Sequence, residues 1–365
     1  MKNKLITTAL VGSMFGFAIS SAVAQTTVTG NLDIAYHALK AKGAQSATNN
    51  SYRGFGQEQQ INIQNKGKLS NGMEYAAGFS WELDGSEVLG GDSTSAAASN
   101  DSTNARQENV FIDFMVSKDL TLSISADHMP NTDVTMTNLV GWGYLGGHGL
   151  QNNGSSYPTS LNDGGYGIGF TYNLGPARLT LQHQPNPGKA AGFNDTGHTM
   201  ESQEDGDENS KYEGILRGDL GVKGLDVLVG FQRQDGRTTA AKDENGERFA
   251  VKYSVGAITV AGDYIKLEGQ DRTTAGSAGT SRTEELKGKS VGIAYAVTPA
   301  LSVGYTQSKA STSAASTEDE KAKMFAIGYN LGAVTVQAQV RDVDNAAGVS
   351  TADGKIGSVK LSTRF

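Results

Sequence analysis

The histidines are the residues best suited to acid–base chemistry in this chain, and their spacing argues against catalysis. Asp127 and His128 are adjacent, but consecutive side chains of a strand point to opposite faces, so the two cannot act as a catalytic pair. The other four histidines are His37, His148, His183 and His198. The chain contains no nucleophile elbow, no H-E-x-x-H zinc motif, no phosphate-binding loop and no cysteine. The sequence therefore predicts that the protein is not an enzyme and needs no cofactor.

A cluster of carboxylates between residues 201 and 208 could suggest a calcium site. Its members are Glu201, Glu204, Asp205, Asp207 and Glu208. An EF-hand loop needs a glycine at its sixth position and a glutamate at its twelfth, and this segment lacks both. We therefore interpret the cluster as an acidic, solvated loop and predict no metal site, with loose binding of Ca²⁺ or Mg²⁺ as the alternative.

Charged side chains also recur at every second position of short segments, where they could act on ions in water. In residues 73–83, Tyr75 and Trp81 share one face of a strand, while Glu74 and Glu82 share the other. Ionised groups are costly in a dry core, so these polar faces are predicted to line an aqueous space. The predicted inward bases are Lys66, Arg178, Arg217, Arg248, Lys252, Arg341, Lys360 and Arg364, and the acids are Asp33, Glu58, Glu74, Glu82, Asp127, Glu213, Asp219 and Asp263.

Opposed charges around an aqueous space create a transverse field that orders water, and their net sign sets ion preference. The two sets are equal in number, so the sequence does not fix which ions are favoured. For any single residue, pairing with a cross-strand neighbour is the simpler alternative.

The elements that must position these charges are antiparallel strands joined by tight turns. Ser70-Asn71-Gly72 is one such turn, because Asn-Gly tolerates positive φ. Seven hairpins plus a first and a last strand give 16 predicted strands, an even number as in bacterial barrels. The predicted segments are 28–36, 57–69, 73–83, 106–116, 120–129, 165–174, 177–185, 211–222, 225–234, 248–255, 257–267, 286–297, 300–309, 323–331, 333–343 and 355–365.

The connections on the opposite side of the predicted sheet are long and polar. They cover residues 40–56, 86–105, 130–163, 187–210, 235–247, 268–285, 310–322 and 344–354. Short turns on one side and long loops on the other are typical of a transmembrane β-barrel, with the turns periplasmic and the loops extracellular. A soluble sandwich of this length would need two domains, and no linker is present.

Composition agrees with a barrel and excludes other classes. No stretch reaches the length of a transmembrane helix, and the mean hydropathy is -0.37. Gly 47 of 365 residues is about twice average usage, which suits turns and curved strands. The net charge of -7 argues against nucleic acid as a partner.

The first residues have the pattern of a secretory signal. Lys2 and Lys4 precede a short apolar stretch, and Ala22-Val23-Ala24 forms an A-x-A cleavage site before Gln25. The prediction is therefore a signal peptide over residues 1–24 and a single barrel domain over residues 25–365.

With these segments laid out, the chain resembles the Gram-negative general porins of the betaproteobacterial and neisserial type. The residues that carry the resemblance are Val28–Asp33, Lys66–Tyr75, Asn109–Phe114 and Val359–Phe365. The resemblance implies a homotrimer of 16-stranded barrels in the cell outer membrane, with lipid and lipopolysaccharide around it. It also implies that the terminal Phe365 is the signal read by the barrel-assembly machinery.

In that family the third extracellular loop folds into the barrel and narrows it, which here corresponds to residues 130–163. Its only carboxylates are Asp133 and Asp163, whereas many such loops are strongly acidic. Gly165, Gly167 and Gly169 follow on one strand face, either as clearance for this loop or to allow strand curvature.

These observations predict a water-filled channel for passive diffusion of ions and small hydrophilic solutes. Its constriction is predicted to include Asp133, Asp163, Arg178 and Arg217. Further lumen charges are Lys66, Glu74, Lys252 and Arg341. The alternatives are a substrate-selective porin for an anion or sugar, and a non-conducting structural or adhesive barrel.

Overall fold

The computed structural model describes residues 24–43, 52–85, 105–126, 128–129, 136–141, 167–185, 210–235, 243–271, 283–312, 318–345, 350 and 352–365. The predicted signal peptide up to residue 23 lies outside the described residues, as does the carboxylate cluster at 201–208. Of the predicted loop 130–163, residues 136–141 are described.

Sixteen strands make up the described structure. They are β1 (Gln25–Gly43), β2 (Tyr52–Lys68), β3 (Glu74–Gly85), β4 (Ala105–Met115), β5 (Leu120–Ala126), β6 (Gly167–Asn173), β7 (Ala177–Gln184), β8 (Lys211–Gly218), β9 (Leu225–Gln234), β10 (Glu244–Val255), β11 (Ile258–Asp271), β12 (Thr283–Ala296), β13 (Leu301–Thr312), β14 (Glu320–Asn330), β15 (Val334–Asp344) and β16 (Ala352–Arg364).

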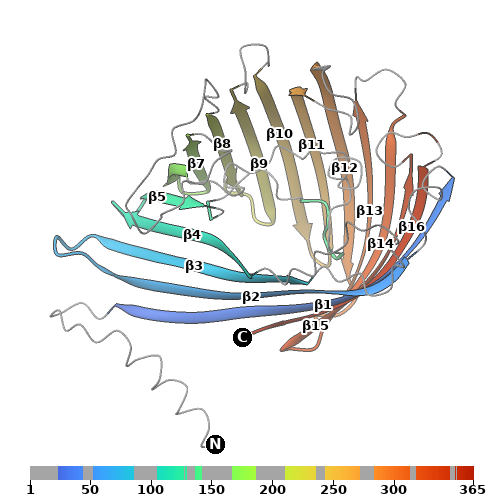
Figure 1. Ribbon diagram of the computed structural model, residues 1–365, viewed down its shortest axis with the longest axis horizontal. Helices are drawn as coiled ribbons and strands as arrows, with labels where there is room; N and C mark the ends of the chain where they lie inside the picture. The colour runs from blue at the N-terminus through green and yellow to red at the C-terminus, as the bar shows by residue number, and fades with distance from the viewer. Residues whose placement is uncertain are drawn as a thin grey trace, which may run out of the picture.

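Each strand pairs antiparallel with its neighbours in sequence, and β1 also pairs with β16 (Figure 1). The closing ladder runs from Asn31 opposite Arg364 to Gly43 opposite Ala352. The sheet is thus a closed barrel without a free edge. The predicted all-β fold and the predicted count of 16 strands are confirmed.

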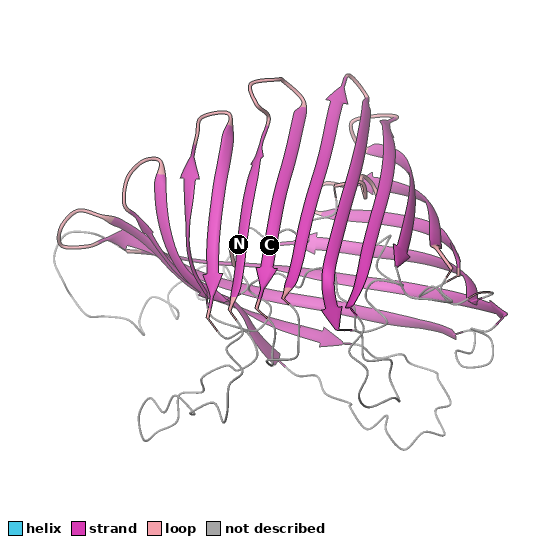
Figure 2. Cartoon of the chain, turned by 90° about the horizontal axis from the view of Figure 1, so that it is seen from above, coloured by secondary structure: helices cyan, strands magenta, loops and turns pink. Residues whose placement is uncertain are grey.

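Seven connections between consecutive strands are described in full, and each has two to six residues. Figure 2 shows these turns side by side along one rim, which we call the short-turn rim. Glycines with positive φ lie in five of these turns, including Gly72 (φ 85°) and Gly332 (φ 90°). The first of these is the Asn-Gly turn that the sequence predicts.

The strand β8 ends at Gly218, earlier than the predicted end at Val222. Leu220 and Gly221 have positive φ values of 51° and 80°, a conformation that cannot continue a strand. The N–H of Gly221 also donates to Oδ1 of Asp219 at 2.9 Å. Residues 219–224 therefore form a separate turn, and Asp219 lies in it rather than on the barrel wall.

The two faces of the sheet differ in chemistry, as alternation requires. On β9, Val229 and Phe231 are exposed on the outer face, while Gln232 and Gln234 are buried on the inner face. Among the described residues, no helix is long and apolar enough to cross a membrane.

Candidate pore lining

The strand register places the predicted inward charges on one face of the closed sheet. Residues directly opposite one another on antiparallel strands share a face. Arg178 is the partner of Arg217, and Lys252 is the partner of Asp226. Following such partners around the barrel puts all eight predicted bases on the inner face, together with every predicted acid except Asp127 and Asp219. Asp127, Asp133 and Asp163 lie outside the described residues.

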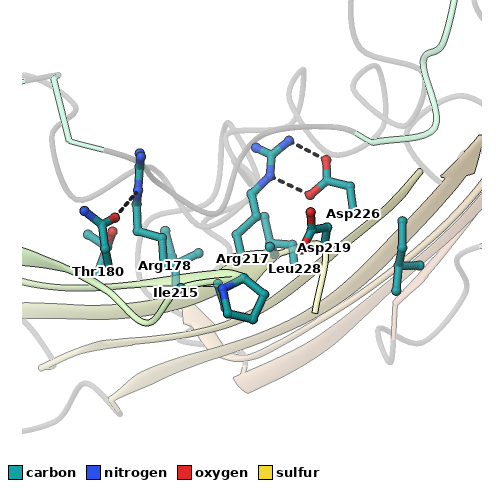
Figure 3. A pocket seen from close by; sticks show the side chains of 13 residues that line it. Arg178, Thr180, Ile215, Arg217, Asp219, Asp226 and Leu228 are labelled. Carbon is teal, nitrogen blue, oxygen red and sulfur yellow. Dashed lines mark hydrogen bonds and ion pairs between the residues drawn. The ribbon is translucent and has the colours of Figure 1, made fainter. Parts of the chain in front are cut away.

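One group of charges lies on β7 to β10 near the short-turn rim. Asp226 accepts hydrogen bonds from Arg217, at 3.1 Å from Nε and 2.8 Å from Nη2. The Nζ of Lys252 lies 3.2 Å from the same carboxylate. Arg178 is next to Arg217 and donates from Nε to Oδ1 of Asn173 at 3.4 Å (Figure 3). Asp226 therefore pairs with both Arg217 and Lys252, whereas Arg178 is hydrogen-bonded to the side-chain amide of Asn173.

A second pair, Arg248 and Asp263, is buried on the inner wall of β10 and β11. Their side chains are 1% and 3% exposed, and Nε of Arg248 donates to Oδ1 at 3.0 Å. Its Nη2 also donates to Oδ2 of Asp263, which makes the pair bidentate. Because both charges are removed from water, their close pairing offsets the cost of desolvation.

A third group lies where the barrel closes. The Nζ of Lys360 on β16 lies 2.9 Å from Oδ2 of Asp33 on β1. Next to it, Nδ1 of His37 is 2.8 Å from Oγ of Ser358. Arg341 is buried on the neighbouring inner wall of β15. This group depends on pairing between the two ends of the chain.

Lys66 and Glu74 lie elsewhere, beside the β2–β3 turn at the short-turn rim. Glu74 is opposite Lys68, and their charged atoms are 3.0 Å apart. Both side chains of this pair are more than half exposed, so the pair is well screened by water.

The described part of the predicted pore loop, residues 136–141, lies against the inner wall. Oγ1 of Thr137 is 2.7 Å from Oγ of Ser290, and the carbonyl of Thr137 accepts a hydrogen bond from Thr306 at 2.9 Å. The carbonyl of Val140 accepts another from Nε2 of Gln337 at 2.7 Å. The segment is thus fastened to β12, β13 and β15, strands far from it in sequence.

Glycines on the inner wall make room for this segment. A methyl group added to Gly304 would lie 2.8 Å from Cγ2 of Val140, and one added to Gly292 would collide with the carbonyl of Thr137. We call Gly292, Gly304 and Gly328 the glycine seat, since the last also faces Val140. The seat lies on β12 to β14.

The glycines of β6 have a different neighbour from the seat. Gly169 faces Met129, whose terminal methyl would lie 2.7 Å from an added Cβ, and Gly167 is buried. Gly165 lies outside the described residues. A side chain at Gly169 would therefore collide with Met129, which precedes the predicted loop, and not with residues 136–141.

The inner wall also carries apolar side chains that sequence alternation does not predict. Met136 packs with Ile215, Leu228 and Ala250, and Val140 packs with Met324 and Ala326. All five wall residues in these contacts lie on the inner face, where a water-filled lumen would favour polar side chains. They are apolar because the inserted segment covers them, which keeps water away.

The sequence analysis missed several inner-wall acids, among them Asp113 and Asp226. Asp113 lies 3.3 Å from Nε2 of His128, whose ring stacks on Phe111, and Asp226 holds two bases. Strand alternation could have identified both, because each is flanked by apolar outward residues. No cluster of three or more histidine and carboxylate groups that could hold a metal ion occurs among the residues described.

Comparison with solved structures finds the same architecture in bacterial porins. The anion-selective porin from Comamonas acidovorans is 12% identical, matches 94% of this chain and 100% of its own, and has a TM-score of 0.67. A porin refined at 1.8 Å is 15% identical, matches 93% of this chain and 100% of its own, and has a TM-score of 0.59. A variant of the Rh. blastica porin is 12% identical over 93% of this chain and 100% of its own, with a TM-score of 0.56. At these identities the likeness is one of fold.

No curated protein sequence matches the chain. A family model for Gram-negative porins, however, matches residues 7–362, almost the whole chain. The closed 16-stranded barrel with an apolar exterior, a charged inner wall and an inserted segment agrees with this match. The chain therefore belongs to the Gram-negative porin family, outer-membrane channels for passive diffusion.

Proposed function

We propose that this chain forms a water-filled pore through which ions and small hydrophilic solutes diffuse passively. The observation that carries the proposal is the charged inner wall of a closed barrel with an apolar exterior. Partly exposed, paired charges such as Arg217 with Asp226 are stable beside water and would be costly in a filled core. Family membership and fold point to a channel rather than an enzyme.

Planar-bilayer recording of the purified protein tests this function. We expect stepwise increases in current, with a conductance that rises in proportion to KCl concentration. A tenfold salt gradient would then give the ion preference from the reversal potential. A barrel that inserts into the bilayer without conducting would contradict the proposal and favour a plugged structural or adhesive barrel.

We further propose that residues 130–163 narrow the pore, with Asp133 and Asp163 close to its narrowest part. The contacts of residues 136–141 with the inner wall support this placement. Deleting residues 142–158 should leave the fastened segment in place and raise the single-channel conductance. An unchanged conductance would mean that the loop does not set the pore width.

Family membership supports a proposal for the assembly of the mature protein. We propose cleavage after Ala24, recognition of Phe365 by the barrel-assembly machinery, and a homotrimer in the outer membrane. N-terminal sequencing of protein extracted from outer membranes would check the cleavage. Chemical crosslinking in native membranes would check the trimer, and a monomeric pattern would contradict it.

The outer wall supports lipopolysaccharide as a neighbour in the membrane. Lys289, Lys309 and Lys321 lie directly opposite one another on β12, β13 and β14, on the outer face. Lys309 is already paired with Asp319, whose Oδ2 lies 2.6 Å from the lysine Nζ. Like charges in such positions repel, so a further anionic group beside Lys289 and Lys321 would stabilise the row. The outer face continues below them with exposed Tyr305 and Phe325, which suit the interface with acyl chains. We propose that the phosphates of lipopolysaccharide bind this lysine row.

A further inference from the structure

A hollow of about 530 Å³ lies on the inner wall beside the short-turn rim (Figure 3). Arg178 and Arg217 line it together with Thr180 and Asn173, and the turn residues Gly175 to Ala177 form one side. Ile215 and Leu228 line the hollow and also contact Met136. The hollow therefore lies directly beside the inserted segment on the inner wall.

Each arginine uses some of its guanidinium nitrogens in a hydrogen bond to the barrel wall and has others that can bind a ligand. Arg178 is fixed through Nε by Asn173, and Arg217 through Nε and Nη2 by Asp226. Among the residues that the structure describes, both Nη groups of Arg178 and the Nη1 of Arg217 have no partner. Figure 3 shows the two side chains leaving neighbouring strands toward the same side. Two guanidinium groups are thus preorganised next to each other with free N–H donors.

The charges that line the hollow are balanced, because Arg178 and Arg217 supply two positive charges and Asp226 and Asp219 supply two negative ones. Lys252 does not line the hollow, but its Nζ lies 3.2 Å from Asp226 and adds a positive charge beside that carboxylate. Asp219 lies in the turn and accepts a hydrogen bond from the Gly221 N–H. Of the two aspartates, Asp226 is the one that forms an ion pair with Arg217. Arg178 and Arg217 are cross-strand partners, and such a pair of like charges is unfavourable unless an anion lies between them.

From this arrangement we propose that the hollow binds a small oxyanion, a phosphate or carboxylate, as it crosses the pore. The oxyanion accepts hydrogen bonds from the Nη groups of Arg178 and from Nη1 of Arg217, a planar fork that matches two oxygens. Thr180 supplies a hydroxyl at the same wall. The inference rests on the proposed channel function and names a class of solute for it.

The test is block of the KCl current by inorganic phosphate in a planar bilayer. The wild-type protein should show saturable, concentration-dependent block. Arg178→Gln should raise the half-blocking phosphate concentration about tenfold, the equivalent of about 1.4 kcal/mol for the loss of two charged donors. Arg178→Lys keeps the charge but loses the planar fork, so its half-blocking concentration should rise by a smaller factor, about threefold.

Two further variants separate the site from general electrostatics. Lys68→Gln removes one positive charge from the same rim, on β2, five strands away from β7, and should leave phosphate block within about twofold of wild type. Asp219→Asn keeps the oxygen that caps Gly221 and removes a negative charge beside the hollow, so it should strengthen the block.

The outcomes distinguish this inference from the channel function itself. Equal loss of block in Arg178→Gln and Lys68→Gln would mean that overall charge, and not this site, acts on phosphate. A conducting wild-type pore without saturable block would overturn the oxyanion site while leaving the channel intact. Absence of any KCl conductance would instead count against the proposed function.

Discussion

Gly30 and Phe365 join the two ends of the barrel through their backbones. The N–H of Gly30 donates to the carbonyl of Phe365 at 2.8 Å, and the N–H of Phe365 donates back at 3.0 Å. The ring of Phe365 lies over Gly30, so that an added Cβ would be 2.6 Å from its Cζ and 2.7 Å from the carbonyl oxygen of Gln60. The last residue of the chain is therefore part of the closing ladder, in addition to its proposed role as an assembly signal.

Gly30→Val should weaken barrel closure, because the new side chain cannot share the space of the Phe365 ring. We expect a loss of about 1–3 kcal/mol of folding stability, as in other overpacked positions. Refolding into detergent micelles without assembly machinery, followed by heat-dependent gel mobility, measures this. Gly357→Val is the matched control, since a Cβ at Gly357 on the same outer face meets nothing within 4 Å. If Gly30→Val refolds as well as the control, Phe365 acts as a signal alone.

Substitution in the glycine seat should displace the inserted segment. In Gly304→Val, the new side chain would push against Val140 and move residues 136–141 away from the wall into the lumen. We expect a smaller single-channel conductance, with about 1–3 kcal/mol of destabilisation from overpacking. Gly56→Val is the control, because Gly56 is also on the inner wall and has open space around it. Equal conductance in the two variants would contradict a role for the seat.

Breaking the buried ion pair should affect stability far more than breaking an exposed one. Asp263→Asn leaves the Arg248 guanidinium buried without its carboxylate, which costs about 3–5 kcal/mol. Glu74→Gln removes the partner of Lys68, and this exposed pair contributes about 0–1 kcal/mol. Thermal unfolding in the same detergent compares the two. Similar melting temperatures would show that water reaches Arg248 and Asp263.

Neutralising the lysine row should release bound lipopolysaccharide. The variant with Lys289, Lys309 and Lys321 each changed to Gln should lose about 3 kcal/mol of attraction, from about 1 kcal/mol per lysine near an anionic surface. Mass spectrometry of protein extracted in mild detergent measures the lipid that remains attached. Lys118→Gln combined with Lys223→Gln removes charges from the short-turn rim and should change little. Equal lipid retention in both variants would rule out the row as the binding site.

Strand alternation, the number of strands and the position of most turns could be read from the sequence. They depend on local properties: which residues alternate, and where glycine and asparagine permit positive φ. The same alternation placed Arg178, Arg217, Lys252 and Arg341 on the inner face, where the structure also has them. It failed at Val222 because the turn at Leu220 and Gly221 interrupts an otherwise regular pattern.

The partners of these residues were decided by the tertiary structure. Asp33 meets Lys360 because the first and last strands pair, and Thr137 meets Thr306 because a loop turns back across a closed barrel. Ile215 and Met324 are apolar although they lie on the inner face, because residues 136–141 cover them and keep water away. Periodicity specifies the face on which a side chain lies, but contacts between distant residues depend on closure of the whole sheet, which no local pattern encodes.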